Sequence, residues 1–207
     1  GSAAKMWGVI AMMDAVAESF PRFTARKVEK YENGDEVAID VDGEPAIFVY
    51  KTVADPFVGK MSFFKVMSGT IKRDMTLKNA NGTAEKLAHF YVMNGKTQIE
   101  VEELACGDIG MIAKLSDTKT NDTLSLSGDV SYSKIAYPTP YMTKAILPLS
   151  AKDESKMSPS IAKMLEEDKT LRYENNKETA QILISGMGET HLSVLVARLE
   201  SRFGVKV

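Results

Sequence analysis

Residues 184–192 read ISGMGETHL, a stretch in which two glycines separate an apolar run from a helical pattern. The preceding residues 179–186 are rich in Ile and Leu and favour a β-strand. From Glu189 onward, apolar residues recur at helical spacing on one face. These residues are Leu192, Leu195, Val196, Leu199 and Phe203. The stretch therefore predicts a strand, a tight turn and an amphipathic helix.

Three interpretations of this turn stay open. Gly186 and Gly188 permit positive φ and close backbone approach, which fits a tight strand-to-helix turn or a surface pressed against another domain. An anion site at the helix N-terminus is the third, and Glu189 in the first turn counts against it. For His191, we weigh a half-buried histidine that donates to a carbonyl against a contact residue for another domain.

The segments around this turn predict an α+β unit. Strand patterns occupy 141–150, 171–175 and 179–186, and the last two flank an NNKE turn. A helix is expected over 153–168, starting between Asp153 and Ser158 because Ser-Pro is typical of a first turn. Residues 204–207, GVKV, predict a final strand. The order β-α-β-β-α-β is that of a ferredoxin-like, split βαβ domain.

Residues 46–126 have a different texture. Short runs rich in β-branched and aromatic residues alternate with turn signals such as Asn81-Gly82 and Asn94-Gly95. Several short strands with regular turns predict an all-β barrel or sandwich. Pro138 and Pro140 mark a junction, and we expect a linker over 132–140. Residues 8–20 predict one further helix, which Pro21 ends.

Composition sets limits on function. The chain has 207 residues, 44% hydrophobic and 26% charged, with a net charge of −2, so no whole-chain basic field indicates nucleic acid. Cys106 is the single cysteine, which excludes an intramolecular disulfide and fits a cytoplasmic protein. No apolar run approaches about 18 residues, so we expect no membrane span.

Three patterns are candidates for enzymatic sites. Cys106 with His89 or His191 lacks any local support for a nucleophile and its base. Glu189-Thr190-His191 offers one histidine where a zinc protease helix needs two. Gly95-Lys96-Thr97 ends like a phosphate loop, but Phe90 occupies the earlier glycine position. We therefore expect a hairpin turn there, no metal site and no catalytic residue.

Four stretches, taken together, resemble elongation factor G and occur in that family's order. They are DPFVGKMSFFKVMSGTI (55–71), VEELACGDIGMIAKLSDTKTNDTLS (101–125), EEDKTLRYE (166–174) and ISGMGETHL (184–192). The resembling segments span about residues 46–207. The resemblance implies a β-barrel domain II over 46–130 and a ferredoxin-like domain III over 131–207. Residues 22–45 would connect them to residues 1–21, the last helix of a GTPase domain.

The resemblance also implies a function for the parent protein. Elongation factor G-like factors bind GTP and Mg, hydrolyse GTP and promote ribosomal translocation in protein biosynthesis in the cytoplasm. This chain would be a non-catalytic, monomeric central fragment without a cofactor of its own. Its partners would be the ribosome, through small-subunit rRNA and protein, and the parent's own GTPase and C-terminal domains. Domain III would couple the nucleotide state to domain movement.

Specific positions match the family's functional surfaces. The interdomain, GTPase-coupling surface would comprise Gly186, Gly188, Glu189, His191, Leu195 and Arg198. Candidate rRNA contacts on or beside the barrel strands are Lys60, Lys65, Lys72 and Arg73. Ser2-Ala3 would be a remnant of the guanine loop, and a cloning scar over Gly1-Ser2 is the alternative.

The sequence departs from the family pattern at three places. Thr190 replaces the usual Leu, residues 93–96 differ from the usual barrel loop, and Asn121 replaces a Gly, which Asn suits because it tolerates left-handed backbone. The paralogue therefore stays open. The alternatives are a ribosome-protection (tetracycline-resistance-like) translational GTPase and an unrelated barrel plus α+β small-molecule enzyme.

Overall fold

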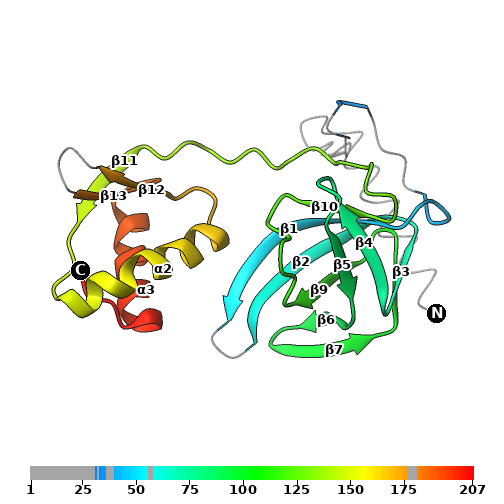
Figure 1. Ribbon diagram of the computed structural model, residues 1–207, viewed down its shortest axis with the longest axis horizontal. Helices are drawn as coiled ribbons and strands as arrows, with labels where there is room; N and C mark the ends of the chain where they lie inside the picture. Colours follow the sequence, from blue (N-terminus) through cyan, green and yellow to red (C-terminus); the bar gives the residue numbers. More distant parts are fainter. Residues whose placement is uncertain (1–30, 32, 36–39, 56–57, 177–180) are drawn as a thin grey trace, which may run out of the picture.

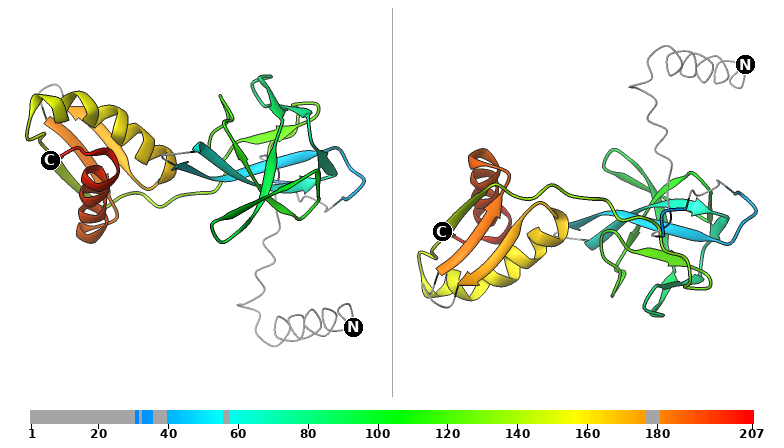
Figure 2. Two further views of the ribbon diagram at one scale, coloured as in Figure 1. Left: turned by 90° about the horizontal axis from the view of Figure 1, so that it is seen from below. Right: turned by 90° about the horizontal axis from the view of Figure 1, so that it is seen from above.

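A computed structural model describes residues 31, 33–35, 40–55, 58–176 and 181–207. The helix expected over 8–20, the segment 1–21 as a whole and Ser2-Ala3 lie outside these described residues, as does much of 22–45. Figure 1 shows two units side by side, a β-rich unit and an α+β unit, and the views in Figure 2 agree.

The first unit is a curled, antiparallel β-sheet that confirms the barrel prediction. Its eight strands follow the order β5-β4-β10-β1-β2-β9-β6-β7, and a further pair, β3-β8, lies beside them. The strands are β1 Ala46–Asp55, β2 Gly59–Ser68, β3 Thr70–Lys72, β4 Met75–Asn79, β5 Ala84–Leu87, β6 Phe90–Asn94, β7 Thr97–Val101, β8 Glu103–Ala105, β9 Ile109–Ala113 and β10 Thr123–Ser125. The strands β7 and β8 were not predicted, because the residues of β7 are mostly exposed and β8 is only three residues long.

A long β1–β2 hairpin lies at the centre of this sheet. Its register runs from Ala46 opposite Ser68 to Asp55 opposite Gly59. On its other edge β1 pairs with β10 over Ala46 to Phe48 alone. In the described part of the chain, the distal half of β1 therefore has a free edge.

Alternating side chains of these strands build the barrel core. The core comprises Ile47, Val49, Phe64, Val66, Ile71, Leu77, Leu87, Phe90, Leu104, Ile112, Leu115 and Leu124. Burying this apolar surface is the main stabilising contribution to the unit. Asn121 adopts the left-handed conformation, with φ of 78°, as its residue type predicts.

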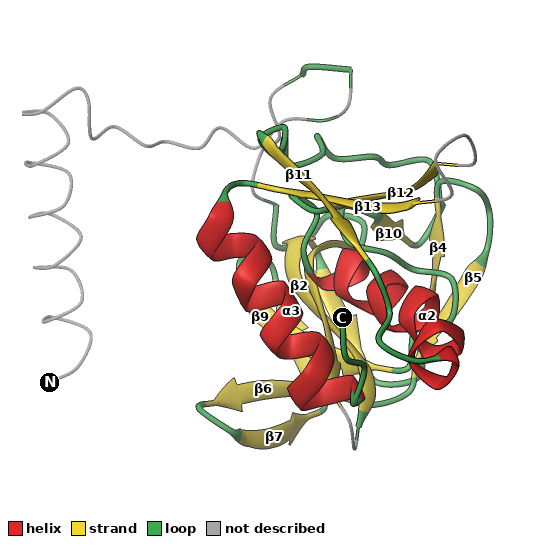
Figure 3. Cartoon of the chain, turned by 90° about the vertical axis from the view of Figure 1, so that its left-hand side faces the viewer, coloured by secondary structure: helices red, strands yellow, loops and turns green. Residues whose placement is uncertain are grey.

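The second unit is an α+β domain of the split βαβ type, as predicted. It consists of β11 Met142–Ile146, α2 Ala151–Glu167, β12 Arg172–Asn176, β13 Gln181–Gly186 and α3 Glu189–Phe203. The antiparallel sheet has the order β11-β13-β12. Both helices cover one face of this sheet (Figure 3). The core between them contains Ile146, Met157, Ile161, Met164, Ile184, Leu192, Leu195 and Leu199.

Two local predictions in this unit are wrong. The helix α2 begins earlier than expected, because Ser150 rather than Ser158 caps it by accepting from the Asp153 N–H, and Pro159 lies inside the helix. Residues 204–207 form no strand. Lys206 accepts one backbone hydrogen bond from the Leu149 N–H, and buried Val205 anchors the segment in the core.

The segment between the units begins on the barrel. The Tyr132 ring stacks on Tyr31 with centroids 5.4 Å apart, and Tyr132 is buried. The Asn121 side chain exchanges two hydrogen bonds of 3.1 Å with the backbone of Ile135. Residues 132–135 of the expected linker are therefore held by the barrel. Among the described residues, no helix is long and apolar enough to cross a membrane.

Candidate functional site

The turn between β13 and α3 is built by close approach, not by positive φ. Gly186 is buried at the end of β13, and a Cβ there would lie 2.8 Å from Leu192 Cδ2. Gly188 caps α3 with an extended φ of 165° and open space around it. Neither glycine adopts the left-handed φ that its residue type permits.

His191, in the first turn of α3, makes one hydrogen bond to the β13–α3 turn and one to the end of α2. Its Nδ1 atom accepts a hydrogen bond from the Met187 N–H at 3.0 Å, and its Nε2 atom lies 3.0 Å from Asp168 Oδ2. Because a backbone N–H can only donate, Nδ1 is the acceptor and Nε2 carries the proton that Asp168 accepts. His191 thus donates to a carboxylate. The structural role weighed from the sequence was a half-buried histidine that donates to a carbonyl, so the acceptor differs.

Asp168 is the C-terminal cap residue of α2 and the partner that joins α2 to α3. Burial acts to raise the pKa of Asp168, but hydrogen bonds from the Thr170 hydroxyl and N–H and from His191 outweigh it and lower that pKa. The carboxylate is therefore held in its charged form. Its charge, after the larger effect of burial, also raises the pKa of Tyr137 in the segment between the units.

Arg198 lies further along α3, beside the same cluster. A shallow pocket there is lined by Met164, Glu167, Asp168, Leu171, His191, Val194, Leu195 and Arg198. The Arg198 side chain is exposed, and the described part of the chain shows no hydrogen bond or ion pair from it. Val194 beside it is 42% exposed. The surface thus offers a guanidinium next to an exposed valine side chain.

The other predicted residues of this surface separate into different environments. Leu195 is only 2% exposed and belongs to the core that positions Arg198. Glu189 is exposed and pairs with Lys144 of β11 at 2.5 Å. Asp168 was absent from the predicted set. The one sequence clue to Asp168 is that it lies in the stretch EEDKTLRYE, which resembles the family. The sequence does not reveal that the loop after α2 folds against α3, so it could not pair Asp168 with His191.

The four basic residues proposed for RNA contact do not share one environment. Lys60 at the start of β2 donates to the Thr118 carbonyl and lies 3.7 Å from Glu166 of α2. Lys65 is half-buried within β2, and Lys72 is exposed at the end of β3. Arg73 is paired with Glu102 at 3.0 Å and with Glu100 at 3.4 Å.

The residues weighed as enzymatic sites have structural partners. Asn94 and Thr97 face each other across a β6–β7 hairpin, with Gly95 at φ of 59°, so Gly95-Lys96-Thr97 is a strand turn. The Cys106 thiol donates to the Met67 carbonyl, whereas His89 pairs with Glu100 at 2.7 Å. Within the described ranges, no cluster of three or more His, Cys, Asp or Glu residues is arranged to hold a metal ion.

Comparisons with known proteins agree with this architecture. A family model described as elongation factor G domain 2 matches residues 44–127, and one described as elongation factor G domain III matches residues 137–207. A crystal structure of a Thermus thermophilus protein is similar with a TM-score of 0.70 and 31% sequence identity. The similarity covers 80% of this chain and 25% of that one, so the chain spans about a quarter of its length. Because two consecutive family models cover about three quarters of the chain in the family's own order, the chain belongs to the elongation factor G family and carries domains 2 and 3 of that translation factor.

Proposed function

We propose that this chain is the central part of a GTP-binding, elongation factor G-like protein that promotes ribosomal translocation in the cytoplasm. In this proposal the barrel contacts the small ribosomal subunit. The α+β unit couples the nucleotide state of a GTPase domain, encoded upstream, to domain movement. We place the boundary between the two domains near residue 131. GTP and Mg belong to the parent protein, not to this chain.

The arrangement around His191 is the observation that supports a coupling role. Two hydrogen bonds fix the His191 ring, so the start of α3 cannot shift without disturbing the end of α2. Arg198 and Val194 remain exposed on the same surface of α3. A rigid base that presents an unpaired guanidinium suits contact with another domain, because Arg makes bidentate bonds to carboxylates and phosphates.

Arg198 also allows a test that does not perturb the fold. In the intact factor, we expect Arg198→Ala to lower ribosome-stimulated GTP hydrolysis several-fold. Basal hydrolysis and the melting temperature should be unchanged, because the side chain has no partner to lose within the described structure. Lys152→Ala, an exposed cation at the other end of α2, is the matched control. Full stimulation of the Arg198 variant would argue against a coupling surface at this position.

A further inference from the structure

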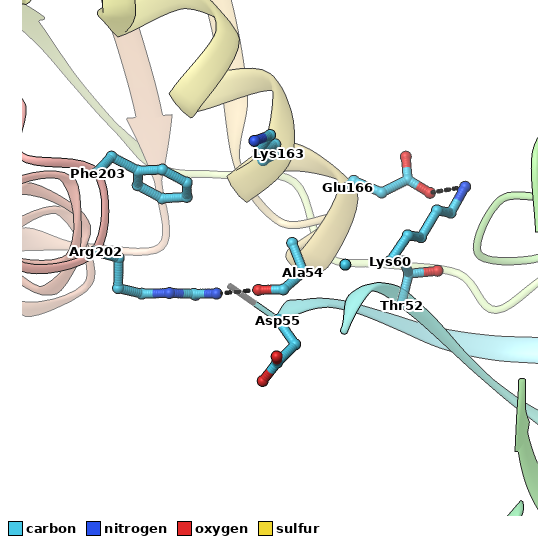
Figure 4. A pocket seen from close by; sticks show the side chains of 9 residues that line it. Thr52, Ala54, Asp55, Lys60, Lys163, Glu166, Arg202 and Phe203 are labelled. Carbon is cyan, nitrogen blue, oxygen red and sulfur yellow. Dashed lines mark hydrogen bonds and ion pairs between the residues drawn. The ribbon is translucent and has the colours of Figure 1, made fainter. Parts of the chain in front are cut away.

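Both backbone groups of Ala54 in β1 are bound by side chains of the α+β unit. The Ala54 N–H donates to Glu167 Oε1 at 2.7 Å, and the Ala54 carbonyl accepts from the Arg202 guanidinium. Arg202 in turn binds the two Glu167 oxygens at 2.9 and 3.0 Å. Figure 4 shows the Arg202 fork pointing at the Ala54 carbonyl from the end of α3.

The position of this contact follows from the sheet. Ala54 lies in the distal half of β1, where the edge is not paired with β10. A free strand edge presents alternating N–H and carbonyl groups. The Glu167 carboxylate and the Arg202 guanidinium supply one acceptor and one donor, as a neighbouring strand would. The α+β unit thus recognises the backbone of the hairpin, not a side chain.

A second contact lies one residue along α2. Lys60, opposite Ala54 in the β1–β2 register, bridges Glu166 of α2 and the Thr118 carbonyl of the barrel. Thr118 lies in the loop between β9 and β10. Glu85, a buried residue, holds this loop by accepting hydrogen bonds from the N–H groups of Ser116, Asp117 and Thr118. Consecutive glutamates at the end of α2 therefore hold the tip of the hairpin on both of its strands.

The remainder of this interface is loosely packed. A cleft of about 300 Å³ separates the hairpin from the helices, and Lys163 and Phe203 line it. Residues 136–140, which connect the units, show no hydrogen bond within the described structure. An interface that is small and polar permits relative domain motion. A few charge-assisted hydrogen bonds then determine how firmly the units are joined.

We propose that Glu167 and Arg202 form a latch that holds the α+β unit on the free edge of β1, and that its opening lets this unit swing about residues 136–140. The pair suits this role because both side chains are largely buried, at 12% and 27% exposure. The hydrogen bond to Glu167 raises the pKa of Arg202 further above its usual value. Loss of Glu167 removes the main partner of the Arg202 charge, and loss of Arg202 leaves the Glu167 charge buried without its cation, which favours separation of the units.

The test measures the distance between the units directly. Thr76→Cys on β4 and Ser155→Cys on α2 provide exposed spin-label sites in a Cys106→Ser background of the 207-residue chain. Pulsed electron paramagnetic resonance should give one narrow distance distribution for the parent. Glu167→Gln and Arg202→Ala should each at least double its width. The double variant should be no broader than either single variant, because both remove the same latch.

Controls distinguish latch opening from other effects. Glu200→Gln removes the exposed pair with Lys206 at 3.8 Å and should leave the width unchanged. A second label pair within the α+β unit, Ser155→Cys and Ala197→Cys, should stay narrow in every variant. Unchanged inter-unit widths in both latch variants would overturn the proposal. It would equally be overturned if Glu200→Gln broadened the distribution as much, or if the distance within the α+β unit broadened too.

Discussion

His191 and Asp168 are hydrogen-bonded through Nε2 and Oδ2 at 3.0 Å, which ties the first turn of α3 to the cap of α2. The two residues are far apart in sequence, on either side of two strands. The carboxylate of Asp168 stabilises the fold only while it is charged. Protonation of Asp168 should therefore lower the free energy of unfolding of the α+β unit.

The lowered pKa of Asp168 predicts acid sensitivity. Because the folded pKa lies below the ordinary value of about 3.9, the stabilisation is complete above that value and is lost as the pH falls through the folded pKa. Asp168→Asn should lower the free energy of unfolding by about 1 kcal/mol at pH 7, and the difference should shrink below about pH 4. Urea titrations across this range measure both. Asp129→Asn, an exposed aspartate, should show neither effect, and a difference for Asp168→Asn that persists unchanged at low pH would contradict the assignment.

The two glycines of the β13–α3 turn should respond differently to alanine. Gly186→Ala places a Cβ 2.8 Å from Leu192 Cδ2 and 3.2 Å from His191 Nδ1, which should cost about 1–3 kcal/mol of unfolding free energy. Gly188→Ala meets open space at an extended φ of 165°, so its effect should stay within about 0.5 kcal/mol. Calorimetry of the two variants tests this. Equal losses would mean that backbone conformation, not close approach, selects glycine here.

Glu85 should be essential for the loop that supports Lys60. Glu85 is 7% exposed, and its carboxylate accepts four hydrogen bonds, the last from the Thr118 hydroxyl at 3.1 Å. Glu85→Ala would leave the two buried Thr118 donors and the part-buried N–H groups of Ser116 and Asp117 without their acceptor, and should cost about 2–4 kcal/mol. Chemical denaturation measures the loss, and hydrogen exchange should accelerate at residues 116–118. The exposed Glu103→Ala is the control; a loss in both variants would point to a general charge effect.

The chain should not bind GTP at Gly95-Lys96-Thr97. A phosphate loop needs a wide glycine-rich turn between a strand and a helix, whereas these residues join β6 directly to β7. Titration calorimetry with GTP and Mg should show no saturable heat. Specific micromolar binding that Lys96→Ala abolishes would refute this prediction together with the fragment interpretation.

The sequence was informative where local chemistry decides the structure. Short runs rich in β-branched and aromatic residues between turn signals predicted most barrel strands, and helical spacing predicted α3 from Leu192 to Leu199. It also predicted the β6–β7 turn, since Asn94-Gly95 determines a hairpin from adjacent residues. It was less informative for β7, whose exposed residues show no buried face. The start of α2 was misplaced because Ser158-Pro159 is typical of a first helical turn, whereas in the structure Ser150 caps the helix and Pro159 lies inside it.

By itself, then, the sequence determined the two fold types and the family, because periodicity and short motifs depend on neighbouring residues. It placed His191 at the start of α3 but left the partner of its ring undetermined. Only the tertiary structure brought Asp168 to His191, and Glu167 with Arg202 to the backbone of Ala54. The physical reason is that these contacts join residues distant in the chain. One of them recognises a backbone N–H and carbonyl, which nearly every residue type presents alike and which becomes available only where a strand edge is left unpaired.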